Sequence, residues 1–145
     1  MKVRDILKTK GPEVLTIGEE KSLKDAISIL VNNKIGVLLV LNNEAKIMGI
    51  LSERDIVKEA YNKPEGYSSS KVRDVMTKKV IVVEADDELD YVESVMTENR
   101  IRHLPVVNNK VLVGLISIGD IVKSQLTSTR IDNKYLMDYI SGAVK

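Results

Sequence analysis

The chain carries one pattern of residues twice, and this duplication limits the possible folds more than any other feature of the sequence. Lys2-Val3-Arg4-Asp5 returns as Lys71-Val72-Arg73-Asp74, and Asp55-Ile56-Val57-Lys58 returns as Asp120-Ile121-Val122-Lys123. The offset between the copies falls from 69 to 65 residues along the chain. It changes beside Gly11-Pro12 and again after paired asparagines, where loops are expected to absorb differences in length. We therefore predict a fold in which one structural unit is used twice.

Each copy predicts the order strand–helix–strand–strand–helix. Apolar residues at i, i+3, i+4 and i+7 indicate a helix that begins at Leu23, and a similar pattern begins at Leu89. Ser22 or Asp87 is expected to cap these helices. Aliphatic stretches on either side of paired asparagines predict a hairpin in each copy, because asparagine tolerates the positive φ of tight turns. The expected strands are residues 14–17, 37–41, 46–51, 80–83, 104–107 and 111–116, and the expected second helices are residues 53–60 and 119–125.

The duplication also divides the chain into parts. We expect a first repeat at 1–60, a polar linker rich in Pro, Gly and Ser at 61–70, a second repeat at 71–126, and a tail at 127–145 that forms a short helix. A unit of about 60 residues buries too little surface to be stable alone, so the two repeats are expected to pack together. The predicted fold class is α+β, with tandem βαββα repeats.

Composition removes several classes of function. The chain has no Cys and one His, which argues against thiolate catalysis and against a metal site with several histidines. The sequence has no Gly-x-Ser-x-Gly elbow and no phosphate loop, so no enzyme is predicted. A net charge of +1 makes nucleic-acid binding unlikely on electrostatic grounds. The longest apolar run has seven residues and the N-terminus lacks a signal peptide, which predicts a soluble cytoplasmic protein without a membrane span.

Three segments carry a resemblance to a known family. They are Val72-Arg73-Asp74-Val75-Met76-Thr77, Asn99-Arg100-Ile101-Arg102-His103-Leu104-Pro105-Val106-Val107 and Val113-Gly114-Leu115-Ile116-Ser117-Ile118-Gly119-Asp120-Ile121, with weaker counterparts in the first copy. In this order and twice, they resemble the paired domains named after cystathionine β-synthase, called CBS pairs or Bateman modules. The resemblance implies a stand-alone regulatory protein, two clefts between the repeats related by pseudo-twofold symmetry, and a homodimer.

The resemblance also implies roles for particular polar residues. Gly-hydrophobic-x-Ser-x-x-Asp occurs at residues 49–55 and again at residues 114–120, where a strand runs into a helix. By resemblance, Asp55 and Asp120 accept hydrogen bonds from the ribose hydroxyls of a nucleotide. The residues assigned to its phosphates are Ser52, Arg54, Ser117, Arg102 and His103. Ser-x-x-Asp is equally the pattern of a helix cap, so both interpretations remain open here.

An adenine ring needs an apolar slot. By resemblance, the slots are formed by Thr16, Ile17, Ile35 and Val37 in one copy and by Val82, Val83, Ile101, Leu104 and Pro105 in the other. The alternative is that these residues belong to the core, because the apolar residues of a strand must pack against something.

These observations favour a sensor that binds AMP, ADP or ATP, with or without Mg²⁺, and reports to a downstream protein. An alternative is a protein-interaction or dimerisation module whose clefts have lost their function. Nucleic-acid binding is a weaker alternative.

Overall fold

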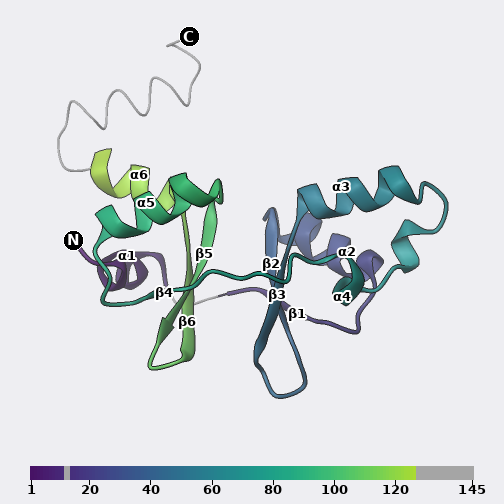
Figure 1. Ribbon diagram of the computed structural model, residues 1–145, viewed down its shortest axis with the longest axis horizontal. Coiled ribbons are helices and arrows are strands. Elements are labelled where there is room, and N and C mark those ends of the chain that lie inside the picture. The colour runs from purple at the N-terminus through teal and green to yellow at the C-terminus, as the bar shows by residue number, and fades with distance from the viewer. Residues whose placement is uncertain (12–13, 127–145) are drawn as a thin grey trace, which may run out of the picture. The chain divides into compact units, whose positions relative to one another are not determined.

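The computed structural model describes residues 1–11 and 14–126 of the 145-residue chain. These residues pack as two compact units (Figure 1). Unit 1 contains the described residues of Met1–Pro12 and Val82–Lys145, and unit 2 contains those of Glu13–Ile81. The helix expected within residues 127–145 lies outside the described residues.

Unit 2 is a three-stranded sheet with helices packed on it. Strand β1 (Thr16–Gly18) runs parallel to β2 (Val37–Leu41), and β2 pairs antiparallel with β3 (Ile47–Ser52). The helices of this unit are α2 (Leu23–Asn33), α3 (Glu53–Asn62), the short 3₁₀ helix η1 (Tyr67–Ser69) and α4 (Val72–Val75).

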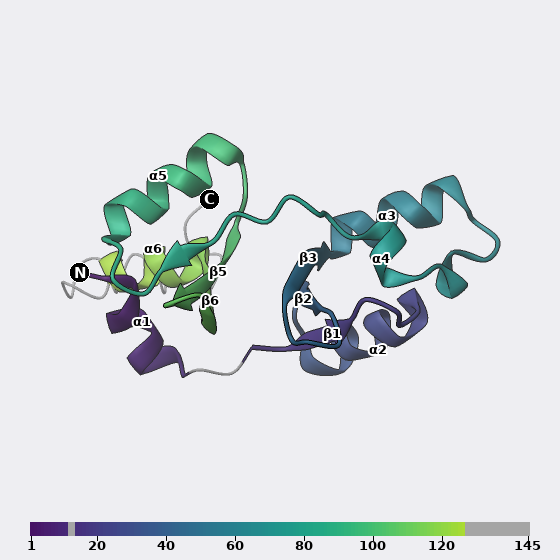
Figure 2. The same cartoon turned by 60° about the horizontal axis from the view of Figure 1, so that its bottom comes forward.

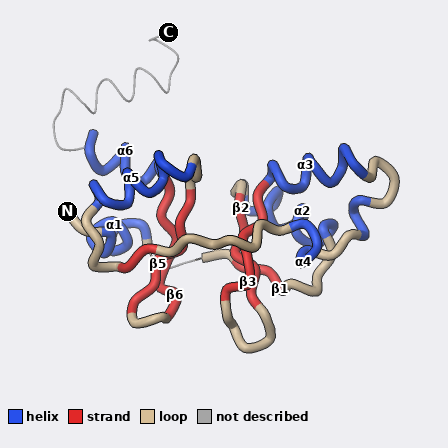
Figure 3. Tube along the Cα trace, viewed as in Figure 1, coloured by secondary structure: helices blue, strands red, loops and turns tan. Residues whose placement is uncertain are grey.

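Unit 1 repeats this topology. Strand β4 (Val83–Glu84) runs parallel to β5 (His103–Asn108), which forms an antiparallel hairpin with β6 (Val111–Ser117). Its helices are α1 (Val3–Lys10), α5 (Leu89–Asn99) and α6 (Ile118–Leu126). Figure 3 shows the two hairpins as paired strands joined by a loop. The predicted α+β class and the tandem βαββα repeats are confirmed.

The two repeats exchange their first helices. Helix α1 packs in unit 1 beside the second repeat, whereas α4 packs in unit 2 beside the first (Figure 2). In unit 1, Val3 N donates to Asp87 O (3.0 Å) and Arg4 N to Ala85 O (2.9 Å). The same pair of bonds recurs in unit 2, where the donors Val72 N and Arg73 N reach the carbonyls of residues 21 and 19 at 2.8 and 3.0 Å. Helix α1 is therefore held by the backbone of the turn before α5, and α4 by the backbone of the turn before α2.

The core of unit 2 forms where the aliphatic pattern predicts it. Leu23, Ala26 and Leu30 face inward from α2 and are buried. Residues 37–40 of β2 are all buried, so this central strand is covered on both faces. The apolar core cluster of this unit also receives Val72 and Met76, so the exchanged helix α4 contributes to the core.

Several local expectations need correction. The first strands lie at Thr16–Gly18 and Val83–Glu84 rather than at 14–17 and 80–83. These are the residues that pair with the central strands β2 and β5. Asp87 does not cap α5; its carboxylate accepts the N–H of Glu84 (2.8 Å) within the preceding turn. Ser22 does cap α2, since its hydroxyl accepts the N–H of Asp25 (3.2 Å).

The two hairpin turns differ from each other. Asn109 has the expected positive φ of 52° in the second turn. In the first turn the positive φ belongs to Ala45, which corrects the expectation for Asn42 and Asn43. Asn42 acts through its side chain instead, because its Oδ1 accepts the N–H groups of Glu44 (2.9 Å) and Lys46 (3.0 Å).

Among the described residues, no helix is both long enough and apolar enough to cross a bilayer.

Candidate functional site

Both Ser-x-x-Asp motifs lie where a strand passes directly into a helix. Ser52 ends β3 and is the N-cap of α3, and Ser117 ends β6 immediately before α6. Asp55 Oδ2 accepts the Ser52 N–H (2.9 Å), while Asp55 N donates to Ser52 Oγ (3.2 Å). Asp120 Oδ2 accepts the Ser117 N–H (2.9 Å), and Asp120 N donates to Ser117 Oγ (3.1 Å). Each motif thus forms a reciprocal helix cap.

The cap occupies one side of each carboxylate. Oδ2 receives the capping bonds in both units, including the bond from the Ser52 hydroxyl (3.0 Å). Within the described residues, the hydrogen bonds to the Asp120 carboxylate all end on Oδ2. The helix-cap interpretation of the motif is therefore observed, and it leaves a second carboxylate oxygen pointing elsewhere.

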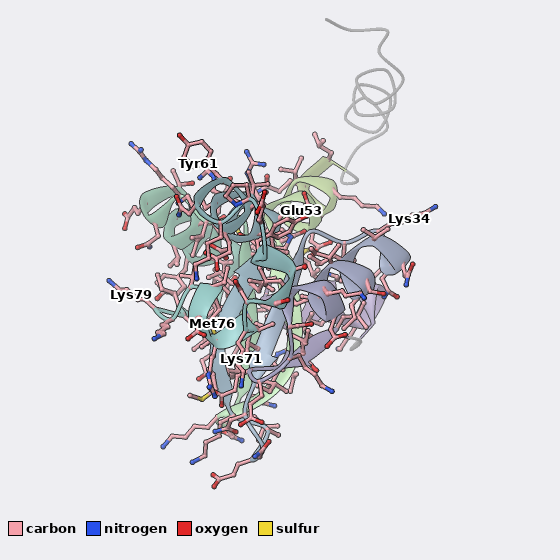
Figure 4. All side chains as sticks on the ribbon, turned by 90° about the vertical axis from the view of Figure 1, so that its right-hand side faces the viewer. Lys34, Glu53, Tyr61, Lys71, Met76 and Lys79 are labelled. Atoms are coloured by element: carbon pink, nitrogen blue, oxygen red, sulfur yellow. The ribbon has the colours of Figure 1, made fainter. Side chains whose placement is uncertain are left out.

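In unit 2, Thr77 lies over the aspartate. The segment after α4 forms a short antiparallel bridge with β3, in which Ile50 N donates to Thr77 O (3.0 Å) and Thr77 N to Ile50 O (2.9 Å). This bridge brings Thr77 Oγ1 to 3.3 Å from Asp55 Oδ1. A Cβ on Gly49 would lie 2.8 Å from the backbone oxygen of Thr77, which the bridge holds in place, so a glycine is required for this approach. Figure 4 shows Met76 beside the ribbon, whereas Lys79 extends away from it.

In unit 1, a lysine from α1 replaces that bridge. Lys10 Nζ donates to Asp120 Oδ2 (2.7 Å) and to the carbonyl oxygen of Leu115 (2.8 Å). Leu115 is the repeat counterpart of Ile50, so the same backbone carbonyl is satisfied by a side chain in one unit and by a backbone N–H in the other. The Lys10 and Asp120 side chains are 34% and 23% exposed, and the ion pair is therefore partly shielded from water.

The environment of Asp120 and His103 alters both of their pKa values. Burial alone would raise the pKa of Asp120, but hydrogen bonds from Lys10 and from the Ser117 N–H outweigh it, and the pKa lies below its usual value. Burial lowers the pKa of His103, and the positive charges of Lys10 and Arg102 lower it further, against the opposing effect of Asp120. The lowered pKa favours the ionised form of Asp120 and the neutral form of His103.

The two units also differ in the charged residues just before the central strand and at the start of the helix. Arg102 is exposed just before β5, and its carbonyl accepts the Ile118 N–H (2.9 Å). Gly36 occupies the corresponding position in unit 2, and its carbonyl accepts the Glu53 N–H (3.0 Å). The Glu53 carboxylate lies against Gly36, 3.2 Å from where a Cβ would be. Arg54 is exposed in the first turn of α3.

The residues assigned to the adenine slots fall into two groups. Five are buried, namely Ile17, Val37, Val83, Leu104 and Pro105. The four with accessible surface are Thr16, Ile35, Val82 and Ile101, and Val82 is the most exposed of them. Ile35 packs against the core cluster of unit 2 with one side. Thr16 begins β1, and Val82 directly precedes β4. Ile35 and Ile101 each lie two residues before a central strand, β2 or β5.

No sequence motif assigned a role in the site to Lys10, Thr77 or Glu53. All three touch the Ser-x-x-Asp caps or the strand beside them. The exchange of the first helices brings Lys10 and Thr77 there, and local sequence patterns give no sign of that exchange. The repeat alignment could have drawn attention to them, because both follow closely on the repeated Val-Arg-Asp segment.

In the described ranges, no group of three or more His, Asp or Glu side chains is placed to hold a metal ion.

Comparisons with known proteins agree with the fold. A family model described as "CBS domain" matches residues 3–62 and 72–127. The chain is 30% identical, over 97% of its length and 72% of the relative's, to the CBS domain-containing protein CBSX3, mitochondrial, of Arabidopsis thaliana. It resembles the crystal structure of the CBS-domain containing protein ATU1752 from Agrobacterium tumefaciens, with a TM-score of 0.83 and 36% identity over 86% of this chain and 99% of that one.

A further solved structure is of interest for its ligands. The CBS domain pair of protein MJ0100 was solved in complex with 5′-methylthioadenosine and S-adenosyl-L-methionine. It has a TM-score of 0.75 and 27% identity over 86% of this chain and 99% of that one.

Proposed function

This chain belongs to the CBS-domain family, and from that membership we propose that it is a regulatory module that binds an adenosine ligand at one or both of its Ser-x-x-Asp caps. In this proposal the vicinal ribose hydroxyls donate to the Asp55 or Asp120 carboxylate. Ser52, Ser117, Arg54, Arg102 and His103 lie on the phosphate side of the ligand.

The observation that carries the proposal is the repeated carboxylate. Both aspartates are fixed by the same cap, and the cap uses Oδ2. An ionised carboxylate has about four acceptor sites, so one that caps a helix can still accept hydrogen bonds from two hydroxyls. The depressed pKa of Asp120 keeps it ionised for this task. The adenosine compounds bound by the MJ0100 pair support the ligand class.

The proposed ligands are AMP, ADP and ATP, with or without Mg²⁺. Arginine and lysine side chains near the cap of unit 1 suit phosphate oxygens, because hydrogen bonds between two charged groups are about twice as strong as neutral ones. The readout is a change in the surface that the protein offers to a partner, and its size is limited by the difference in ligand affinity between the two conformations.

Calorimetric titration with AMP, ADP and ATP tests the proposal. Asp55→Asn and Asp120→Asn are each expected to weaken one binding event by about ten- to a hundredfold. Asp25→Asn is the matched control, because Asp25 has the same Ser-x-x-Asp spacing on α2 and donates its N–H to Ser22 in the same way. Affinities that fall equally in all three variants, or in none, would contradict the ribose role.

A second candidate function has support on α3. Val57 and Tyr61 are 66% and 86% exposed, and their i, i+4 spacing puts both on one face of the helix. Exposed apolar side chains grouped in this way suit a protein interface, here a homodimer. Sedimentation velocity of the Val57→Ser/Tyr61→Ser double variant tests it: a dimer that dissociates supports the interface, and an unchanged sedimentation coefficient contradicts it.

A further inference from the structure

The two caps differ in the charge that surrounds the aspartate. Lys10 Nζ is paired with Asp120 Oδ2 at 2.7 Å. His103 begins β5 opposite Ser117, and the exposed Arg102 directly precedes it. At the corresponding positions of unit 2 the chain has Gly36 and Val37. Thr77 rather than a cation contacts Asp55, Glu53 adds a carboxylate beside Gly36, and Arg54 is exposed in the first turn of α3. Among the described residues, a cation therefore bonds the aspartate itself at the cap of unit 1, and a neutral hydroxyl does so at the cap of unit 2.

Ribose hydroxyls that bind Asp120 would lie beside Lys10. Lys10 and the Ser117 N–H both bond Oδ2, so Oδ1 can accept the hydroxyls while the Lys10–Asp120 pair stays in place. Lys10 Nζ is a three-donor group with two acceptors in this structure, the Asp120 carboxylate and the Leu115 carbonyl. A ligand that carries a phosphate would give the third donor an anionic partner, and an uncharged nucleoside would not. Lys10 therefore adds a charged contact only for an anionic ligand.

From this difference we infer that Lys10 is a specificity-determining residue, which makes the cap of unit 1 prefer phosphorylated adenosine ligands to uncharged ones more strongly than the cap of unit 2 does. The inference rests on the proposed function. It goes further in ranking the two units by their preference for ligand charge and in giving the selecting role to a residue from the exchanged helix α1.

The chain provides its own reporter for unit 1. His103 is the one histidine in the sequence, so its imidazole gives a single resonance beside the Asp120 cap. Titrations with AMP and with adenosine, followed by this resonance at pH 8, give an apparent Kd for each ligand at this cap. The variants are Lys10→Gln, which removes the charge, and Lys10→Arg, which keeps it. Lys8→Gln is the matched control, because Lys8 is exposed on the same helix and its loss changes the net charge equally.

The expected result is a change of preference. Lys10→Gln should weaken AMP binding by about tenfold and leave adenosine binding within about twofold, because the substitution removes a partner for the phosphate and leaves Asp120 Oδ1 able to accept the ribose hydroxyls. Lys10→Arg should retain the preference for AMP, and Lys8→Gln should leave both affinities within about twofold.

Two outcomes separate the inference from the proposed function. If wild-type protein binds AMP or adenosine but Lys10→Gln changes both affinities by the same factor, the selecting role of Lys10 is wrong while ligand binding stands. If neither ligand shifts the His103 resonance or produces heat in the calorimeter, the proposed function fails and the inference fails with it.

Discussion

Units 1 and 2 contain the same helix cap, but a different group bonds the strand carbonyl beside it in each unit. In unit 2 the backbone of Thr77 pairs with Ile50, and in unit 1 the side chain of Lys10 takes over the equivalent carbonyl of Leu115. The first helix explains the difference: α4 ends after four residues and lets the chain extend along β3, whereas α1 continues for eight residues to Lys10. Duplication has kept the backbone frame, and divergence has changed the charge next to the aspartate.

The largest expected difference between the units concerns two glycines. A Cβ on Gly49 would lie 2.8 Å from the backbone oxygen of Thr77, whereas a Cβ on Gly114 would meet the methyl end of the Leu7 side chain at 2.8 Å. Because a side-chain end can turn aside and a paired backbone cannot, Gly49→Ala should cost about 2–3 kcal/mol and Gly114→Ala about 1 kcal/mol. Urea unfolding measures both. Equal losses would mean that the bridge of unit 2 is no more rigid than the leucine contact of unit 1.

The serine caps should show how alike the units remain. Ser52→Ala and Ser117→Ala each remove the acceptor for the N–H of an aspartate in the first helical turn. Each substitution is expected to lower the free energy of unfolding by about 1 kcal/mol, the usual cost of losing an N-cap side chain. Ser22→Ala on α2 gives the reference value for a cap without the proposed ligand role. A loss in one unit but not the other, measured by urea unfolding, would break the proposed equivalence.

The smallest expected effect is a pH dependence that belongs to unit 1. Burial lowers the pKa of His103, so as pH falls through about 6.5 the unfolded chain takes up a proton that the folded protein resists. Stability should therefore fall between pH 8 and pH 5.5. Val37 takes this position in unit 2 and does not titrate.

His103→Gln provides the check on this pH effect. The free energy of unfolding of the variant should change less over this range than that of the wild type. Asp120 contributes in a different window: its lowered pKa stabilises the fold above about pH 4, and that contribution is lost in more acidic solution. Parallel curves for wild type and variant between pH 8 and pH 5.5 would show that burial does not disfavour the imidazolium.

Local patterns predicted most of the fold. The duplication, the helices that begin at Leu23 and Leu89, and both hairpins follow from spacing that a short window of sequence contains. The exchange of α1 and α4 could not be found in this way. Lys10 and Asp120 are 110 residues apart in sequence, and no periodicity links an exposed lysine on one helix to the cap of another.

The candidate site was predictable only in outline. Ser-x-x-Asp identified both caps, since the two residues bond each other within one turn. The groups that make the caps different, Lys10 and Thr77, reach them through tertiary packing. For buried residues assigned to the adenine slots, such as Leu104, the sequence could not distinguish a ligand contact from a core contact. An apolar residue in a strand is equally expected in either place.

The order in which wild-type protein fills its two caps tests the account most directly. The His103 imidazole reports on unit 1, and the methyl group of Met76, which adjoins Thr77, reports on unit 2. With AMP, the His103 signal should respond at lower ligand concentration than the Met76 signal, and with adenosine the gap between the two signals should shrink. An equal gap for both ligands would contradict the claim that the two units, alike in backbone, differ in their preference for ligand charge.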